Sequence, residues 1–184
     1  YGYISVLTDS KREPMPLFPN KYDLANIGMP TTAYVMPPSG EQIEVFKDGK
    51  AAETKYVSRP ERLIRAIKTR FKEGSISVPN INGAVDVKNI YSAIARDLIV
   101  LAEEELANKN IAPIYDVVFT FPASFSDDST LLEMMQTSIE SLVIDGEKIN
   151  VLGRLPEPAA VAIDYLHYMQ NLAPEEIKIS SNQY

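Results

Sequence analysis

Cysteine is absent from this 184-residue sequence, and histidine occurs once, as His167. Without cysteine, neither disulfides nor thiolate chemistry is available. A single histidine nearly excludes a His-based catalytic triad or a metal site built from several histidines. No apolar run approaches the ~20 residues that cross a bilayer, and no signal sequence is present. We therefore expect a cytoplasmic protein without a membrane partner.

Positive charge is also in deficit, because 18 Lys and Arg stand against 25 Asp and Glu and give a net charge of −7. Nucleic acids are bound through clustered Lys and Arg, so a nucleic-acid partner is disfavoured. Apolar residues make up 45% of the chain, which is enough for a sizeable core at this length. The sequence opens at Tyr1 inside an alternating stretch and stops at Tyr184. We expect a piece of a longer protein that lacks part of its site.

The first part of the chain is predicted to form short strands. Apolar residues alternate at 3–8, residues 31–36 are rich in strand-forming types, and residues 43–46 precede a hairpin signal at 47–50. A helix is then predicted to begin near Pro60 and to end at Gly74. Its apolar stripe consists of Leu63, Ile64, Ile67 and Phe71. A longer helix is predicted from about Val87 to Asn108, with Ile90, Ile94, Leu98 and Leu101 at helical spacing.

Strands and helices alternate in the second part of the chain. Strands are predicted at 117–121 and 149–152, each followed by a helix. Thr130 and Glu133 fit a capping box for the first of these helices, although Asp127 is an alternative cap. Pro156-Glu157-Pro158 opens the second. This order predicts an α/β fold with a mixed or parallel sheet.

A basic segment stands out in this acidic chain. Its six cations within fourteen residues are Arg59, Arg62, Arg65, Lys68, Arg70 and Lys72. They could meet phosphate groups, but a solvated helix face is the simpler interpretation. Lys68 differs because it lies at the edge of the apolar stripe, from which a lysine can reach into a cleft.

Glu157 and Pro122 each follow a predicted strand. Open α/β sheets place ligands beyond the carboxyl ends of their strands, and a carboxylate there can hold a metal-bound water or orient an attacking one. The alternative is that Glu157 satisfies the helix dipole and that Pro122 only ends its strand. No glycine-rich phosphate loop occurs in the sequence, so no complete nucleotide site is visible.

Six segments occur in a distinctive order, at residues 30–35 (PTTAYV), 48–52 (DGKAA), 59–61 (RPE), 66–70 (AIKTR), 117–125 (VVFTFPASF) and 155–165 (LPEPAAVAIDY). Together these segments resemble the seventy-kilodalton heat-shock chaperones of the DnaK type. The resemblance implies one lobe of the ribonuclease H-like, actin-like ATPase fold. Residues 1–36 and 111–184 would form its core, without the first strand, and residues 37–110 an inserted small α+β subdomain.

The resemblance also implies roles for three residues. Lys68 falls on the catalytic lysine that contacts the γ-phosphate, Glu157 on the glutamate that places magnesium through water, and Pro122 on a nucleotide-dependent switch. The parent would bind ATP or ADP with Mg and couple hydrolysis to unfolded peptides, a J-domain co-chaperone and a nucleotide exchange factor. Thr130 replaces a family arginine that transmits the switch, and Pro156 replaces an asparagine.

Two consequences and two alternatives follow. Both phosphate loops of the family would lie outside this chain, so we expect no ATP hydrolysis and no tight nucleotide binding by the chain alone. The absent central strand would leave an open sheet edge, filled by a partner chain, by self-association or by the tail 177–184. The alternatives are half of another actin-like ATPase or sugar kinase, or a non-catalytic interaction module that keeps the fold.

Overall fold

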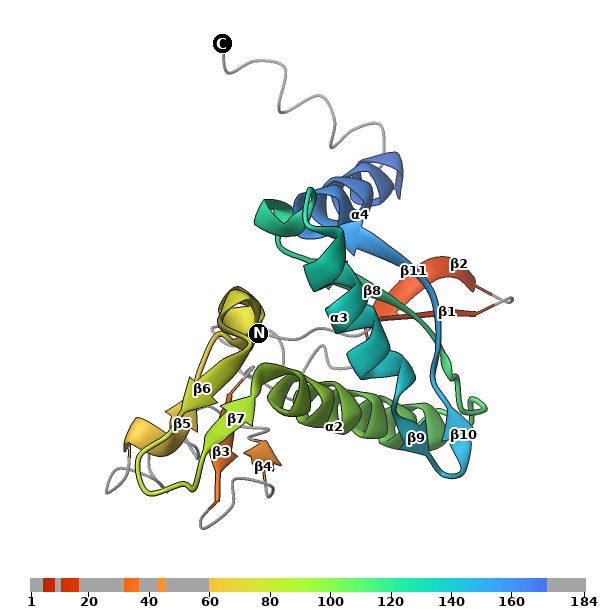
Figure 1. Cartoon of the computed structure of the whole chain (residues 1–184). Coiled ribbons are helices and arrows are strands. Elements are labelled where there is room, and N and C mark those ends of the chain that lie inside the picture. Colours follow the sequence, from red (N-terminus) through yellow and green to blue (C-terminus); the bar gives the residue numbers. More distant parts are fainter. Residues whose placement is uncertain (1–4, 9–10, 17–31, 37–42, 46–59, 172–184) are drawn as a thin grey trace.

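The computed structural model describes residues 5–8, 11–16, 32–36, 43–45 and 60–171 (Figure 1). It is a mixed α/β structure in which helices pack against several small sheets. This confirms the predicted fold class at that level. No helix within the described ranges is long and apolar enough to span a membrane.

Among the described residues, three small sheets precede the long helix. Strand β1 (Ser5–Thr8) pairs antiparallel with β2 (Lys11–Pro16). Strand β3 (Ala33–Val35) lies between β4 (Ile43–Val45) and β5 (Leu63–Ile64), and both pairings are antiparallel. Strand β6 (Ser75–Ser77) pairs with β7 (Ala84–Asp86). The boundary predicted at residue 36 therefore falls just after a strand that shares its sheet with β4 and β5 from the other side of that boundary.

The single helix predicted from Pro60 to Gly74 is wrong. The segment instead forms a 3₁₀ turn η1 (Pro60–Arg62), strand β5, and a 3₁₀ helix η2 (Ile67–Glu73). Ala66 breaks the helix because its backbone is left-handed, with φ 52° and ψ 45°. Gly74 does end η2, with a positive φ of 69° that suits glycine.

Helix α2 (Val87–Asn108) has the predicted bounds. Asp86 begins it as the N-cap, where its carboxylate accepts a hydrogen bond of 2.8 Å from the Lys88 amide. One connected cluster of buried apolar side chains includes Val35 from β3, Ile90 from α2, Phe119 from β8 and Met135 from α3. The β4-β3-β5 and β6-β7 sheets and the second half of the chain thus meet across α2.

The second half begins with β8 (Asp116–Phe121) and continues through a 3₁₀ turn η3 (Ala123–Phe125) into α3 (Ser129–Glu140). Strands β9 (Val143–Ile144) and β10 (Glu147–Lys148) form a hairpin, followed by β11 (Asn150–Pro156) and α4 (Glu157–Asn171). Strands β8 and β11 are parallel, as the alternation predicts. The N-cap of α3 is Asp128, whose carboxylate accepts from the Leu131 amide, rather than the Thr130–Glu133 box or Asp127.

The two strand pairs β1–β2 and β8–β11 belong to separate sheets among the described strands. Direct pairing of β1 with β8 would have removed the reason to expect a filling strand, and this pairing is not found. The tail 177–184, one suggested filler, lies outside the described residues. The division into core and inserted subdomain stays a prediction.

Candidate functional site

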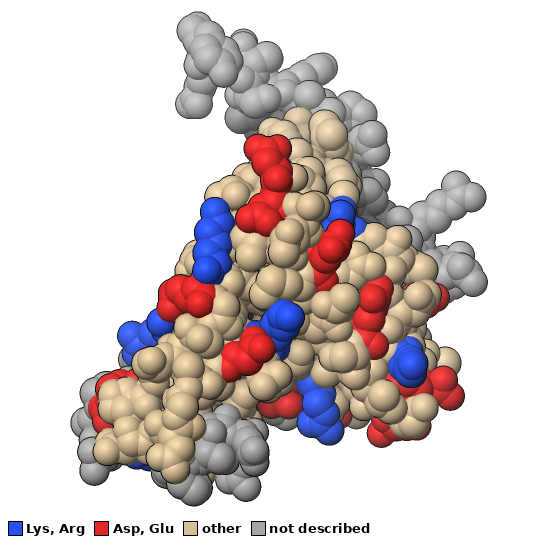
Figure 2. Space-filling model, viewed as in Figure 1, with Lys and Arg blue, Asp and Glu red and all other residues tan. Residues whose placement is uncertain are grey.

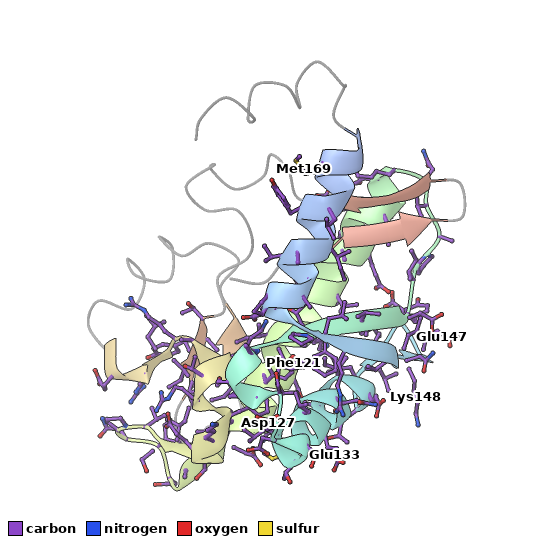
Figure 3. The ribbon with its side chains drawn as sticks, turned by 90° about the horizontal axis from the view of Figure 1, so that it is seen from above. Phe121, Asp127, Glu133, Glu147, Lys148 and Met169 are labelled. Atoms are coloured by element: carbon purple, nitrogen blue, oxygen red, sulfur yellow. The ribbon has the colours of Figure 1, made fainter. Side chains whose placement is uncertain are left out.

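Pro122 and Glu157 lie just beyond the carboxyl ends of the parallel strands β8 and β11. In the register of these strands Phe121 pairs with Pro156, so each predicted site residue comes one position after a paired residue. Figure 3 shows Phe121 where β8 ends, next to the start of α4. The carboxyl ends of parallel strands are where α/β proteins gather ligand-binding groups.

The side chain of Lys68 reaches the carboxyl ends of these two strands from η2. Its Nζ donates to Glu157 Oε1 at 2.8 Å and lies 3.4 Å from the carbonyl oxygen of Thr120, the second residue before Pro122. The left-handed turn at Ala66 redirects the chain immediately before η2 begins. The structure therefore brings together the two charged groups predicted from the sequence and places them beside the third predicted residue.

The Lys68–Glu157 ion pair is accessible to solvent. The side chain of Lys68 is 23% exposed and that of Glu157 is 45% exposed. Exposed ion pairs of this kind contribute about 0–1 kcal/mol to stability, so the pair adds little to holding the fold. An accessible ammonium can instead bind a phosphate oxygen, and the adjacent carboxylate can orient a water molecule.

Lys72 provides a second contact between η2 and the end of β8. Its Nζ lies 5.5 Å from the ring centroid of Phe125, a geometry suited to a cation–π interaction. Phe125 is buried and belongs to η3, which starts directly after Pro122. The amide of Phe125 also donates to the Pro122 carbonyl at 2.9 Å. Two lysines of η2 thus contact the chain around Pro122: Lys68 contacts Thr120 before it, and Lys72 contacts Phe125 after it.

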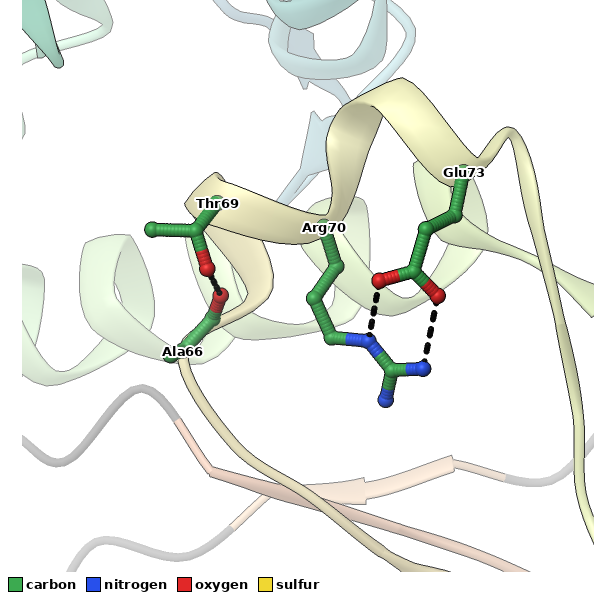
Figure 4. A network of polar contacts seen from close by, with 4 residues as sticks. All are labelled: Ala66, Thr69, Arg70 and Glu73. Carbon is green, nitrogen blue, oxygen red and sulfur yellow. Dashed lines mark hydrogen bonds and ion pairs between the residues drawn. The ribbon is translucent and has the colours of Figure 1, made fainter.

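Arg70, another cation of the basic segment, has its ion-pair partner within η2 and not in the site. Arg70 binds Glu73 through two hydrogen bonds of 2.8 and 2.7 Å, beside the Thr69–Ala66 contact (Figure 4). The Arg70 guanidinium lowers the pKa of the Glu73 carboxyl. Positive and negative side chains alternate over the face shown in Figure 2. These observations favour a solvated face around Arg70, while Arg59 lies outside the described residues.

Tyr91 is a member of this neighbourhood that the sequence reasoning missed. It is 6% exposed on α2, and its ring meets Phe71 of η2 edge-on, with centroids 4.9 Å apart and planes at 84°. Burial raises the pKa of the Tyr91 hydroxyl, and the negative charge of Glu157 raises it further. The sequence signal for Tyr91 was its place next to Ile90 in the apolar stripe of a helix. A tyrosine there is notable because a buried tyrosine hydroxyl usually has a hydrogen-bond partner.

The raised pKa of Tyr91 predicts a stability that falls at high pH. The ordinary tyrosine pKa of 10.0 applies to the unfolded chain, so above pH 10 the unfolded state loses this proton before the folded state does. The free energy of unfolding then falls as pH rises, by up to about 1.4 kcal/mol per pH unit for this group. Urea unfolding at pH 9, 10 and 11 should show a shallower decline in Tyr91→Phe than in wild type. Equal declines would contradict this assignment.

A magnesium ion would find one carboxylate, Glu157, among the site residues. No group of three or more His, Asp or Glu suited to a metal occurs in the described ranges. Mg²⁺ commonly keeps several waters and uses one or two carboxylates together with substrate phosphates. Glu157 fits such a role through water.

Lys68 and Glu157 form one contact pair beside the strand that ends before Pro122, although they come from distant parts of the sequence. This placement, together with the buried Tyr91, defines the candidate site. No family model and no curated protein matches this chain.

Proposed function

We propose that this chain is one lobe of the nucleotide-binding domain of a DnaK-type chaperone, with an actin-like ATPase fold. The observation that carries the proposal is the 2.8 Å contact between Lys68 Nζ and Glu157 Oε1. These residues are 89 positions apart in the sequence. They meet at the carboxyl ends of the parallel strands, where an α/β protein would receive a nucleotide.

The chemistry of phosphoryl transfer suits this pair. The reaction depends on positioned charge more than on a covalent nucleophile. The Lys68 ammonium would hold the γ-phosphate, and the Glu157 carboxylate would orient the attacking water or a magnesium-bound water. Pro122, which directly precedes η3, would transmit the change in ligand to the rest of the lobe. Both phosphate loops would come from other parts of the parent protein.

The partners proposed with this function are unfolded peptides, a J-domain co-chaperone and a nucleotide exchange factor. Among the described strands, β8 has one neighbour, β11. A parallel pair of two strands is smaller than the sheets in which parallel strands are usually found. We include in the proposal that the free edge of β8 receives a further strand, from the parent protein or by self-association.

A non-catalytic module that keeps the fold is the second candidate. It is favoured by Thr130, which is exposed near the start of α3 and replaces the arginine expected from the resemblance. The Lys68 ammonium also has a carboxylate partner already. In this case the ion pair would be structural, and the parent protein would bind no nucleotide.

ATP turnover separates these candidates. We expect the complete parent protein to hydrolyse Mg·ATP and to release a fluorescent unfolded peptide when ATP is added, whereas the 184-residue chain alone should show no turnover. Steady-state phosphate release and peptide anisotropy measure the two properties. Turnover by the isolated chain would overturn the expected division of the site. Absence of ATP binding by the parent in calorimetry would favour the module, and phosphorylation of a sugar panel would favour a kinase.

A further inference from the structure

Lys72 is a cation of η2 that the proposed chemistry does not use. Its side chain is exposed, and its Nζ lies 5.5 Å from the ring centroid of Phe125. Among the residues that the structure describes, it takes part in no ion pair. Its interaction with another segment is therefore the attraction between an ammonium and an aromatic face.

Phe125 is a firmly held partner for this ammonium. Its side chain is 2% exposed. Its amide donates to the Pro122 carbonyl at 2.9 Å, and its carbonyl accepts from the Asp128 amide at 2.9 Å. Asp128 is also the N-cap of α3. A side chain that binds this ring is thus tied to the turn that joins β8 to α3.

Helix η2 depends on its contacts for a fixed orientation. It has seven residues and lies between Ala66 and Gly74, which both have positive φ. A 3₁₀ helix has poorer hydrogen-bond geometry than an α-helix, so η2 is not rigid by itself.

The two lysines of η2 contact the chain on either side of Pro122. Lys68 Nζ lies 3.4 Å from the Thr120 carbonyl oxygen, and Lys72 lies over Phe125. A helix held at one point can rotate about that point, whereas a second contact farther along restricts the rotation. The contact of Lys72 therefore limits how far Lys68 can move.

We propose that Lys72 is a positioning residue of the candidate site, whose ammonium on Phe125 holds η2 in the orientation that keeps Lys68 beside Glu157. The inference rests on the proposed function, in which Lys68 meets a phosphate at this place. A charged group stabilises developing charge best when it is already in position.

Chemical labelling of Lys68 in the 184-residue chain tests this without any nucleotide. An amine reacts with acetic anhydride mainly while it is out of its ion pair, so the labelling rate reports how often the Lys68–Glu157 pair opens. Lys72→Gln should raise the Lys68 rate about two- to fivefold, the factor that corresponds to a cation–π interaction at an exposed site. Loss of a nearby positive charge would by itself slow labelling, because it favours the charged form of Lys68, which does not react.

Peptide mass spectrometry gives the rate at each lysine, with exposed Lys148 on β10 as the internal reference. Lys72→Arg keeps a cation that can lie over the ring and should restore the wild-type Lys68 rate. In a Phe125→Leu background, Lys72→Gln should leave the rate unchanged, because the partner of the ammonium is already gone. The matched control is Lys109→Gln, which removes an exposed lysine at the C-terminal end of α2 and should label as wild type.

Three results would overturn the role of Lys72. They are an unchanged or slower Lys68 rate in Lys72→Gln, a faster rate that Lys72→Arg does not restore, and a full effect of Lys72→Gln in the Phe125→Leu background. A faster rate that Lys72→Arg restores would support the role, even if calorimetry shows that the parent protein binds no ATP. That combination would reject the nucleotide function alone.

Discussion

Replacing Phe71 with alanine is expected to lower the free energy of unfolding by about 3–5 kcal/mol, the usual cost of removing a buried phenylalanine. Phe71 is 1% exposed and is among the largest fully buried side chains of the described residues. The substitution removes its apolar contacts and the edge-on contact with Tyr91, and it leaves a cavity between η2 and α2. Urea denaturation followed by circular dichroism measures the change.

The matched control is Val161→Ala on α4, where the side chain is 69% exposed. This change should stay within about 0.5 kcal/mol of wild type. If Phe71→Ala proves too unstable to purify, Phe71→Leu retains much of the volume and should cost less than about 1.5 kcal/mol if the core repacks. A Phe71→Ala protein as stable as Val161→Ala would contradict the placement of η2 against α2.

The same anchoring makes a prediction about the site in partly stable Phe71 variants. The Lys68 amine should react faster with acetic anhydride in Phe71→Leu than in wild type, because η2 would pack less tightly against α2 and the Lys68–Glu157 ion pair would open more often. The stability of the core and the geometry of the site are therefore coupled through one 3₁₀ helix. This coupling explains why a short helix with two buried residues, Ile67 and Phe71, matters for a charged pair at its exposed side.

Elements with a sustained periodic pattern could be predicted from the sequence. Helix α2 begins and ends as expected because its buried apolar side chains recur from Val87 to Leu106 and Asp86 supplies a cap. The order β8, α3, β11, α4 was also predictable, since each strand and helix has its own period. Cap residues were harder, because Asp127, Asp128 and Thr130 all offer an oxygen within three positions and only the backbone geometry selects Asp128.

The segment 60–74 could not be predicted by the same means. Leu63 and Ile64 fit a helical stripe, yet they pair with Tyr34 and Ala33 in a sheet. The left-handed backbone of Ala66 has no signature in its side chain. Long-range pairing decided this segment over its local pattern, as tertiary contacts often do.

The site was only partly accessible to sequence reasoning. Local patterns marked Lys68 and Glu157 as unusual, but each also had an ordinary structural interpretation. Their roles came from the resemblance to a family, and no spacing rule could place residues 89 positions apart within 2.8 Å. Tyr91 was missed because an aromatic residue in an apolar stripe looks like core until its neighbours are known.

If the proposed function holds, replacing Lys68 with alanine in the complete parent protein is expected to reduce ATP turnover by about 100- to 1000-fold. That is the usual effect of removing one preorganised group that stabilises developing charge. The variant loses the ammonium that contacts Glu157 and that would hold the γ-phosphate. Phosphate release at saturating Mg·ATP measures the change. Lys148→Ala is the control, since Lys148 is exposed at the far end of the β8–β11 unit (Figure 3), and its turnover should remain at the wild-type rate.

A stability measurement makes the result interpretable. Because the ion pair is half-exposed, its loss should change the free energy of unfolding by no more than about 1 kcal/mol. Lys68→Ala should therefore unfold at nearly the same urea concentration as wild type while its turnover collapses. Full turnover in this variant would reject a catalytic role for Lys68. Turnover and stability lost together would instead indicate that the pair supports the fold, which is the role expected of a non-catalytic module.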